Sequence, residues 1–313
     1  MKNLINYLLL ILMVTACSER SIEDTLPDPK EPEVYRIPIV IHVLHMGDPV
    51  GQGDNLSMER IKSQIRVLNE DFRRKPNTNG FNDDHLSKDA GIEFYLAQIA
   101  PDGTSTNGVN RVDINSQPPP GFGGNRIAMG AHYIMWDPEK YLNIWTWPGV
   151  KDTGVGEARF PVSDLPGLED EAYMVIPGVD NLSGFPIELV DGIAITSMHF
   201  GVSDLDSPYN LGRTGTHEMG HFLGLLHIWG DDEHEGTCEA DDFCDDTPPT
   251  KIRTLGSPNN LLACDGSAAM VENYMDYTDD IMMNKFTKEQ IARMRYVLEN
   301  SPRRKTLVNQ SLQ

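Results

Sequence analysis

The spacing of apolar residues divides the chain into short strands, a few helices and long loops. Residues 37–44 are mostly apolar and rich in β-branched side chains, which predicts a buried strand. Between Leu56 and Phe72 apolar residues recur at helical spacing, and Ser57 is placed to cap that helix. Alternating or clustered apolar residues predict further strands at residues 91–100, 141–147 and 192–198, with a short edge strand at 155–160.

The second half of the chain has fewer regular signals until its last helix. Residues 107–124 are rich in proline and glycine and predict a loop, as do most of residues 231–285. Thr287 and Gln290 have the spacing of a capping box at the start of a helix. A strand, a helix, three more strands and a helix near Arg213 together predict an α+β fold with a mixed sheet.

The size and charge of the chain limit its architecture and its partners. Its 313 residues suffice for one good-sized core, or for two subdomains on either side of a cleft. The 47 acidic and 26 basic side chains give a formal charge of −21, which argues against nucleic acid or an anionic membrane surface as partner. The excess is compatible with calcium binding and a cationic substrate, although a solvated acidic surface explains most of it.

Residues 1–17 have the features of a targeting segment that is not part of the fold. Lys2 supplies a positive start, and the apolar run over residues 4–14 is too short to span a bilayer. The sequence before Cys17 is similar to a bacterial lipoprotein signal, in which this cysteine is lipidated; an ordinary secretory signal is the alternative. Residues 18–34, rich in proline and acid, predict a disordered tether. With a lipoprotein signal or with an ordinary secretory signal, the mature protein is expected outside the cytoplasm.

The remaining cysteines are compatible with one disulfide. If Cys17 carries lipid, Cys238, Cys244 and Cys264 are left, and an oxidising compartment permits one bridge with one thiol over. The sequence itself does not fix which two of them pair. Metal ligation by these cysteines is the alternative, but no histidine is well placed to join them.

The strongest chemical signal is a His-Glu-x-x-His pattern followed by a glycine and a third histidine. On a helix, His217 and His221 lie one turn apart, so both imidazoles leave the same face and can hold one zinc ion. Glu218 then lies beside the open coordination position. Gly224 can adopt positive φ, stop the helix and turn the chain so that His227 becomes the third ligand. Three protein ligands and a water describe a catalytic zinc site.

This extended motif resembles that of the metzincin zinc peptidases. Its flanks, Leu-Gly-Arg-Thr at residues 211–214 and Ile-Trp-Gly-Asp at 228–231, are similar to those of the pappalysin family of metzincins. Further on, Asn-Tyr-Met-Asp-Tyr-Thr-Asp-Asp at residues 273–280 resembles the Met-turn of that family. The resemblance extends, with gaps, from Arg36 to about Thr287.

The resemblance implies a metzincin fold within residues 35–303. An upper subdomain, residues 35–227, would hold the twisted mixed sheet and the active-site helix. A smaller, loop-rich lower subdomain, residues 228–303, would contain the Met-turn and the C-terminal helix, and residues 304–313 would form a tail. The edge strand at 155–160 would run along the cleft and pair with substrate backbone, an ordinary rim loop being the alternative.

The resemblance also implies roles for individual residues. Glu218 would be the general base, and Met275 an apolar floor beneath the metal rather than a ligand. Tyr277 would stabilise the tetrahedral oxyanion or act as a movable fifth ligand. By the spacing found in the family, Cys238 would pair with Cys264.

Two further expectations concern calcium and cleavage preference. By resemblance to calcium-binding pappalysins, the expected calcium ligands are Asp242, Asp245 and Thr247; a solvated acidic loop is the alternative. Just past the Met-turn, where relatives that cut before basic residues place an acid, this chain has Ile281-Met282. These two residues therefore do not predict a preference for arginine, and the cleavage preference stays open.

These features predict an extracytoplasmic, lipid-anchored zinc endopeptidase that cuts proteins or peptides as a monomer. Its cofactors would be Zn²⁺ and, where the acidic loop binds it, Ca²⁺, with no nucleic-acid partner and no membrane contact beyond the lipid. One alternative is a surface lipoprotein that keeps the fold and binds substrate without cutting it. Retention of Glu218 and of all three histidines argues against that alternative. A non-peptidase metallohydrolase is the other, and the Met-turn resemblance argues against it.

Overall fold

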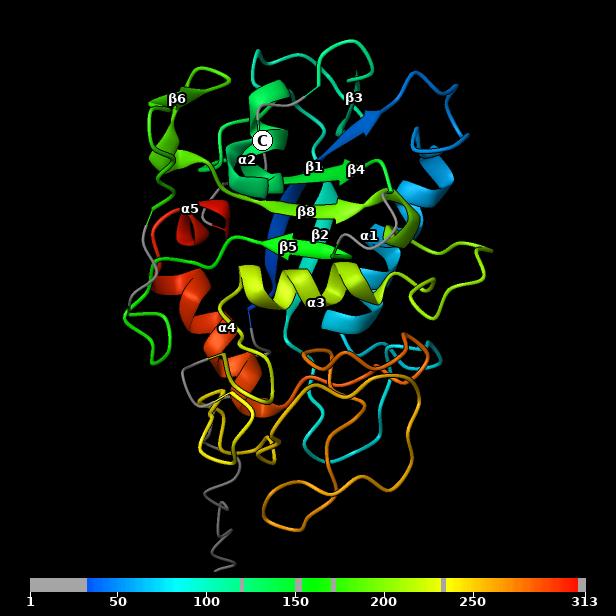
Figure 1. Cartoon of the computed structure of the whole chain (residues 1–313), viewed down its shortest axis with the longest axis vertical. Helices are drawn as coiled ribbons and strands as arrows, with labels where there is room; N and C mark the ends of the chain where they lie inside the picture. The colour runs from blue at the N-terminus through cyan, green and yellow to red at the C-terminus, as the bar shows by residue number, and fades with distance from the viewer. Residues whose placement is uncertain (1–32, 119–120, 150–153, 170–172, 232–234, 309–313) are drawn as a thin grey trace, which may run out of the picture. The chain divides into compact units, whose positions relative to one another are not determined.

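A computed structural model describes residues 33–118, 121–149, 154–169, 173–231 and 235–308, and the fold below is that of the unit from Val34 onward (Figure 1). The expected lipidation site, Cys17, and nearly all of the expected tether lie outside these residues. Within the described ranges, no helix combines the length and apolar character needed to cross a bilayer.

The core of the unit is a mixed sheet with the order β2-β1-β4-β8-β5. The central strand β1 (Tyr35–His45) pairs in parallel with β2 (Ile92–Leu96) along its first half and with β3 (Val109–Asp113) along its second. On its other side lies β4 (Leu142–Trp147), followed by β8 (Ile193–Thr196), both parallel. The outermost strand, β5 (Gly156–Ala158), is antiparallel to β8. The prediction of a mixed sheet is confirmed.

Helices cover both faces of this sheet, which explains why β1 is apolar almost throughout. Side chains of β1 alternate between two cores, as the period of two along a strand requires. Ile39 and Ile41 join the core under α1 (Met58–Phe72) and α3 (Arg213–Phe222), whereas Leu44 joins the core under α2 (Arg126–Tyr133). In α1 the N-cap Ser57 accepts a hydrogen bond from the Arg60 amide, as expected from the sequence.

Two elements lie where the sequence predicted loop or tail, and one helix, α2, lies in residues to which it assigned no element. Strand β3 occupies part of residues 107–124, and helix α2 follows it; Asn125 caps α2 by accepting from the Ala128 amide. At the other end, residues expected in the tail form α5 (Arg304–Val308), followed by the undescribed residues 309–313. Arg304 makes α5 part of the fold because its buried guanidinium donates to both carboxylate oxygens of Asp191.

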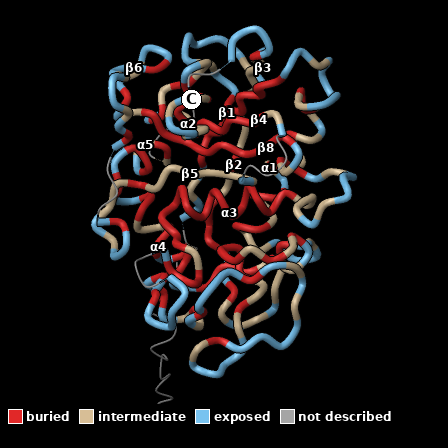
Figure 2. Tube along the Cα trace, in the orientation of Figure 1, coloured by how far each residue is buried: buried red, intermediate tan, exposed pale blue. Residues whose placement is uncertain are grey.

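The residues after α3 are mostly loop, as expected, and end at α4 (Lys288–Asn300). The predicted capping box of α4 is present, with reciprocal hydrogen bonds between Thr287 and Gln290. In the loop region Cys238 and Cys264 form a disulfide, and Cys244 is a buried free thiol. Figure 2 shows α3 buried along its whole length and much of the loop region exposed. Small elements complete the order: β6 (Asn181–Leu182), β7 (Phe185–Pro186) and the 3₁₀ turns Phe122–Gly124, Ile187–Leu189 and Ser197–His199.

Candidate active site

Helix α3 and the turn that follows it bring three histidines together. The helix ends at Phe222, and Gly224 has a φ of +90°, which permits the chain to turn back. The Nε2 atoms of His217 and His221 lie 3.1 Å apart, and those of His221 and His227 lie 3.2 Å apart. Among the described residues, these three form the only group of His, Cys, Asp and Glu side chains arranged to hold a metal.

The distances fit a tetrahedral zinc site. Zinc–nitrogen bonds of about 2.05 Å at tetrahedral angles place two ligand nitrogens about 3.3 Å apart. The two histidines on α3 each have a backbone acceptor for Nδ1. It is the carbonyl of Tyr274 at 2.7 Å for His217 and that of Leu225 at 2.8 Å for His221. An Nδ1–H that donates to a carbonyl leaves the Nε2 lone pair free for a metal. Burial lowers the pKa of His217 well below its usual value and that of His221 to about 3, so both rings are neutral.

Asp231 contacts the third histidine, although its sequence position indicated only an acidic loop. Its Oδ1 accepts from His227 Nδ1 at 2.5 Å, and its Oδ2 accepts from the His227 amide at 3.0 Å. A carboxylate at this position fixes the ring orientation of a metal-binding histidine and increases its basicity. The available signal was the spacing, because an acid four residues after the third histidine can reach back to it.

Glu218 is buried between α3 and the edge strand β5. A β-carbon built on Gly156 would lie only 2.2 Å from Glu218 Oε1, so only glycine leaves room for the carboxylate. Burial, together with the charge of Glu157, raises the pKa of Glu218 to about 8, while the cation of Arg126 opposes the rise. A divalent cation at the histidines would lower it, because positive charge favours the carboxylate.

The outer edge of β5 is occupied by a side chain from α2. Val155 O and Arg159 N bond to β8, so the alternation of an antiparallel ladder turns the carbonyls of Gly154 and Gly156 away from the sheet. Arg126 donates to both carbonyls, at 2.5 Å and 2.8 Å. Figure 1 shows β5 between β8 and α3, so this edge borders the helix that carries His217 and His221.

The segment expected to be the Met-turn passes beneath the histidines. Met275 is fully buried, and a β-carbon on Gly220 of α3 would lie 2.4 Å from its sulfur. The Tyr277 ring lies 5.3 Å from that of His217 and 5.0 Å from that of His227, centroid to centroid. Burial and the nearby charge of Glu218 raise the pKa of Tyr277 to about 12, so its hydroxyl is protonated and can donate.

A cavity of about 290 Å³ lies beside Glu218 and Tyr277 and is also lined by Tyr209, Met283 and Asp280. Asp280 Oδ2 accepts the amides of Leu211 and Arg213 at the start of α3. Its buried Oδ1 has no hydrogen-bond partner among the described residues, and burial raises the pKa of this carboxyl to about 6. Asp280 lies one residue before Ile281-Met282, the position at which the sequence shows no acid.

The expected calcium ligands are brought together only in part. Asp242 is buried, and both of its oxygens accept from the Thr247 hydroxyl, at 2.7 and 2.8 Å. The Asp245 amide donates instead to Glu289 at the start of α4, and no hydrogen bond in the described part of the chain links the Asp245 carboxylate to this pair. Burial raises the pKa of Asp242 to about 7.

Comparison with known proteins gives consistent matches. The peptidase M43 family model, described as pregnancy-associated plasma protein-A, matches residues 193–299. The chain is 42% identical over 255 residues to an extracellular metalloprotease of Arthroderma benhamiae, covering 81% of this chain and 74% of that protein. It is 28% identical over 289 residues to extracellular metalloprotease 1 of Coccidioides posadasii, with 90% and 81% covered.

A solved structure also matches along nearly its whole length. Mature mirolysin of Tannerella forsythia, in complex with a cleaved peptide, superposes with a TM-score of 0.70 at 32% sequence identity. The match covers 89% of this chain and 97% of mirolysin.

Proposed function

The chain belongs to the pappalysin family (M43) of zinc metalloendopeptidases. We propose that it hydrolyses peptide bonds at a zinc ion held by His217, His221 and His227, with Glu218 as general base. The observation that carries this proposal is the convergence of three Nε2 atoms, 3.1 and 3.2 Å apart, next to a buried glutamate. The names of the relatives support a site of action outside the cytoplasm.

Glu218 would move the proton that peptide hydrolysis requires. Zinc, when bound, supplies a Lewis acid for the scissile carbonyl and lowers the pKa of the attacking water. Glu218 accepts a proton from that water and passes it to the leaving amine. Its burial, which favours the protonated form, and the cation of Arg126, which favours the carboxylate, support both halves of this transfer.

Two residues of the Met-turn would assist. The Tyr277 hydroxyl, kept protonated by its raised pKa, would donate a hydrogen bond to the oxyanion of the tetrahedral intermediate. Met275 would support the histidines from below, because its sulfur packs against Gly220 in the last turn of the active-site helix. The substrate backbone would add to the outer edge of β5, where the carbonyls of Gly154 and Gly156 point away from the sheet.

The side chain that follows the cut bond would enter the cavity next to Glu218. The buried and unpaired Oδ1 of Asp280 favours a basic side chain there, since a guanidinium or ammonium group would satisfy it. Residues 281–282 did not indicate this preference, because neither of them is acidic.

Peptidase assays with Glu218 variants test the proposal. Cleavage of denatured casein by residues 18–313 should be abolished by a chelator and restored by zinc. Glu218→Gln should retain stoichiometric zinc and fold normally, but cut at least about 100-fold more slowly. Full activity of Glu218→Gln would contradict the base assignment. Folded, zinc-loaded wild-type protein that cuts no substrate would instead favour the non-catalytic binding lipoprotein.

Calcium and the lipid anchor form a second part of the proposal. Calcium would bind at the Asp242–Thr247 loop, where a buried carboxylate lies among further acids. Added calcium should then raise the melting temperature of wild-type protein and not that of Asp242→Asn. Lipidation at Cys17 is supported by the sequence alone, and mass spectrometry of the mature N-terminus, compared with Cys17→Ser, tests it.

A further inference from the structure

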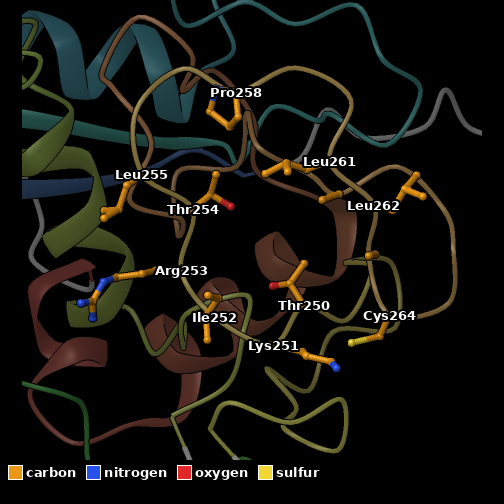
Figure 3. A pocket seen from close by; sticks show the side chains of 12 residues that line it. Thr250, Lys251, Ile252, Arg253, Thr254, Leu255, Pro258, Leu261, Leu262 and Cys264 are labelled. Carbon is orange, nitrogen blue, oxygen red and sulfur yellow. The ribbon is translucent and has the colours of Figure 1, made fainter.

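A second cavity, of about 480 Å³, lies within the loop that follows the acidic segment (Figure 3). Two stretches of this loop form its walls, residues 250–255 and residues 258–269. Figure 3 shows the side chains of Ile252, Leu255, Leu261 and Leu262 distributed around the cavity, with Thr254 and Pro258 between them. We call this cavity the loop pocket.

The apolar side chains of the loop pocket are exposed rather than buried in a core. Leu262 is 71% exposed and Ile252 is 63% exposed, and Leu255 and Leu261 are exposed as well. None of the four belongs to a hydrophobic core cluster among the described residues. Exposed large apolar side chains that gather around one hollow typically mark a binding surface.

The charge of the loop pocket is opposite to that of the chain. None of its twelve lining residues is acidic, whereas the chain as a whole carries 47 acidic side chains. Lys251 and Arg253 line it, and within the described ranges neither forms an ion pair with a carboxylate. The surface therefore suits a partner that combines apolar side chains with carboxylates.

The walls of the loop pocket are held in place by covalent and backbone bonds. The disulfide of Cys264 ties one wall to Cys238, and the Cys264 amide donates to Pro249 O at 2.8 Å. Within the same wall the Ala269 amide donates to Leu261 O at 2.9 Å. A cavity that is already formed before binding loses less conformational entropy when a ligand occupies it.

The loop pocket lies next to the active-site cavity, with one layer of bonded chain between them. The Thr254 amide donates to Asp276 Oδ1 at 2.7 Å, and Gly256 forms a bridge with Thr278. Asp276 and its neighbour Tyr277 in turn line the cavity beside Glu218. One stretch of chain thus separates the loop pocket from the catalytic cavity, so a polypeptide held in the cleft can reach both.

We propose that the loop pocket is an exosite that binds a segment of the substrate polypeptide away from the cut bond, with apolar side chains flanked by carboxylates. The proposal rests on the peptidase function proposed above. It assigns selection among protein substrates to a surface outside the catalytic cavity. A substrate that occupies both places gains effective concentration at the catalytic cavity.

Matched peptides test the exosite separately from catalysis. Each would share one core sequence, taken from a bond that the wild type cuts in denatured casein. Two peptides would each carry one Leu/Glu tail of about twelve residues, which spans about 40 Å when extended. The tail precedes the core in one peptide and follows it in the other. A second pair would carry Gly/Ser tails. We expect kcat/KM to be about tenfold higher for one Leu/Glu peptide than for its Gly/Ser partner.

Variants of exposed residues connect this preference to the loop pocket. Ile252→Ser/Leu262→Ser should abolish the tenfold preference and leave cleavage of Gly/Ser peptides unchanged. Val50→Ser/Val175→Ser is the matched control, because these side chains are 62% and 76% exposed and line neither cavity. Lys251→Glu should reduce the preference for a Leu/Glu tail and create one for a Leu/Lys tail.

Three outcomes would overturn the proposal. The first is equal cleavage of Leu/Glu and Gly/Ser peptides by the wild type, and the second is a preference that survives in Ile252→Ser/Leu262→Ser. The third is a dimer in sedimentation that these substitutions dissociate without any change in peptide preference, because the pocket would then bind a second copy. Cleavage of the Gly/Ser peptides in all three cases would leave the peptidase function intact.

Discussion

The imidazole of His227 and the carboxylate of Asp231 form a hydrogen bond of 2.5 Å between Nδ1 and Oδ1. Of the three histidines, His227 alone has a charged acceptor, since His217 and His221 donate to backbone carbonyls. It is also the histidine that lies outside α3, beyond the Gly224 turn. The carboxylate therefore orients the one histidine of the three that no helix holds in place.

Replacing Asp231 by alanine should weaken zinc binding. Loss of such an outer carboxylate typically costs about 10- to 100-fold in metal affinity. Competition with a chromophoric chelator measures this directly, without reference to activity. Asp265→Ala, in an exposed turn, is the control. Unchanged zinc affinity in Asp231→Ala would show that His227 needs no partner to bind the metal.

Replacing Asp280 by asparagine should change cleavage preference. The amide oxygen can still accept the amides of Leu211 and Arg213, but the negative charge beside the cavity is lost. We expect kcat/KM for peptides with arginine after the cut bond to fall about 10- to 100-fold, as for loss of one charged hydrogen bond. Peptides with leucine there should be cut as well as before.

Asp279→Asn is the matched control for this prediction, because Asp279 bonds to Ser257 and does not line the cavity. Wild-type enzyme that cuts arginine and leucine peptides equally well would exclude Asp280 as a selectivity residue.

The parts of the fold that the sequence predicted are those with a strong local signal. The apolar run of β1, the spacing in α1 and the capping box of α4 each lie within one segment. Strand β3 was missed because its side chains are largely half-buried and polar, and its pairing partner β1 is about 70 residues earlier. Helix α2 was missed because Gly130 disfavours a helix, and its packing against Trp145 cannot be seen locally.

The residues of the site also divide into those that local sequence predicts and those that only the fold brings together. The histidines, Glu218 and Gly224 follow from spacing on one helix and its turn. Arg126 and Asp280 come from distant segments, so that only the fold brings them to the cleft. A sequence motif identifies the centre of this site, and tertiary structure supplies the residues that surround it.

Replacing Arg126 by alanine should tighten substrate binding. The guanidinium donates to the carbonyls of Gly154 and Gly156, the same outward-facing groups with which a substrate strand would pair. A substrate must displace two charged hydrogen bonds, so we expect KM for an extended peptide to fall about three- to tenfold in Arg126→Ala. Single-turnover kinetics separate this change from an effect on Glu218. A higher KM would show that Arg126 prepares the edge for substrate instead.

Asp242 should make the stability of the metal-free protein depend on pH. An unfolded aspartate releases its proton near pH 3.8, whereas burial raises the pKa of folded Asp242 to about 7. Between these values the folded state binds more protons than the unfolded state, so the free energy of unfolding falls as pH rises. The expected loss from Asp242 between pH 4 and 7 is about 2–4 kcal/mol.

Asp242→Asn should remove this part of the pH dependence, because the amide does not titrate. Urea unfolding of both proteins in EGTA, at half-unit steps from pH 4 to 8, measures the difference between them. Calcium should reverse the sign in the wild type, since a bound cation favours the carboxylate and makes stability rise with pH. Asp265→Asn is the control, because hydrogen bonds from Ser267 lower the pKa of that carboxyl instead of raising it. This variant should keep the fall in stability that the wild type shows between pH 4 and 7. Parallel pH profiles of the wild type and Asp242→Asn would show that the buried carboxyl stays ionised across this range.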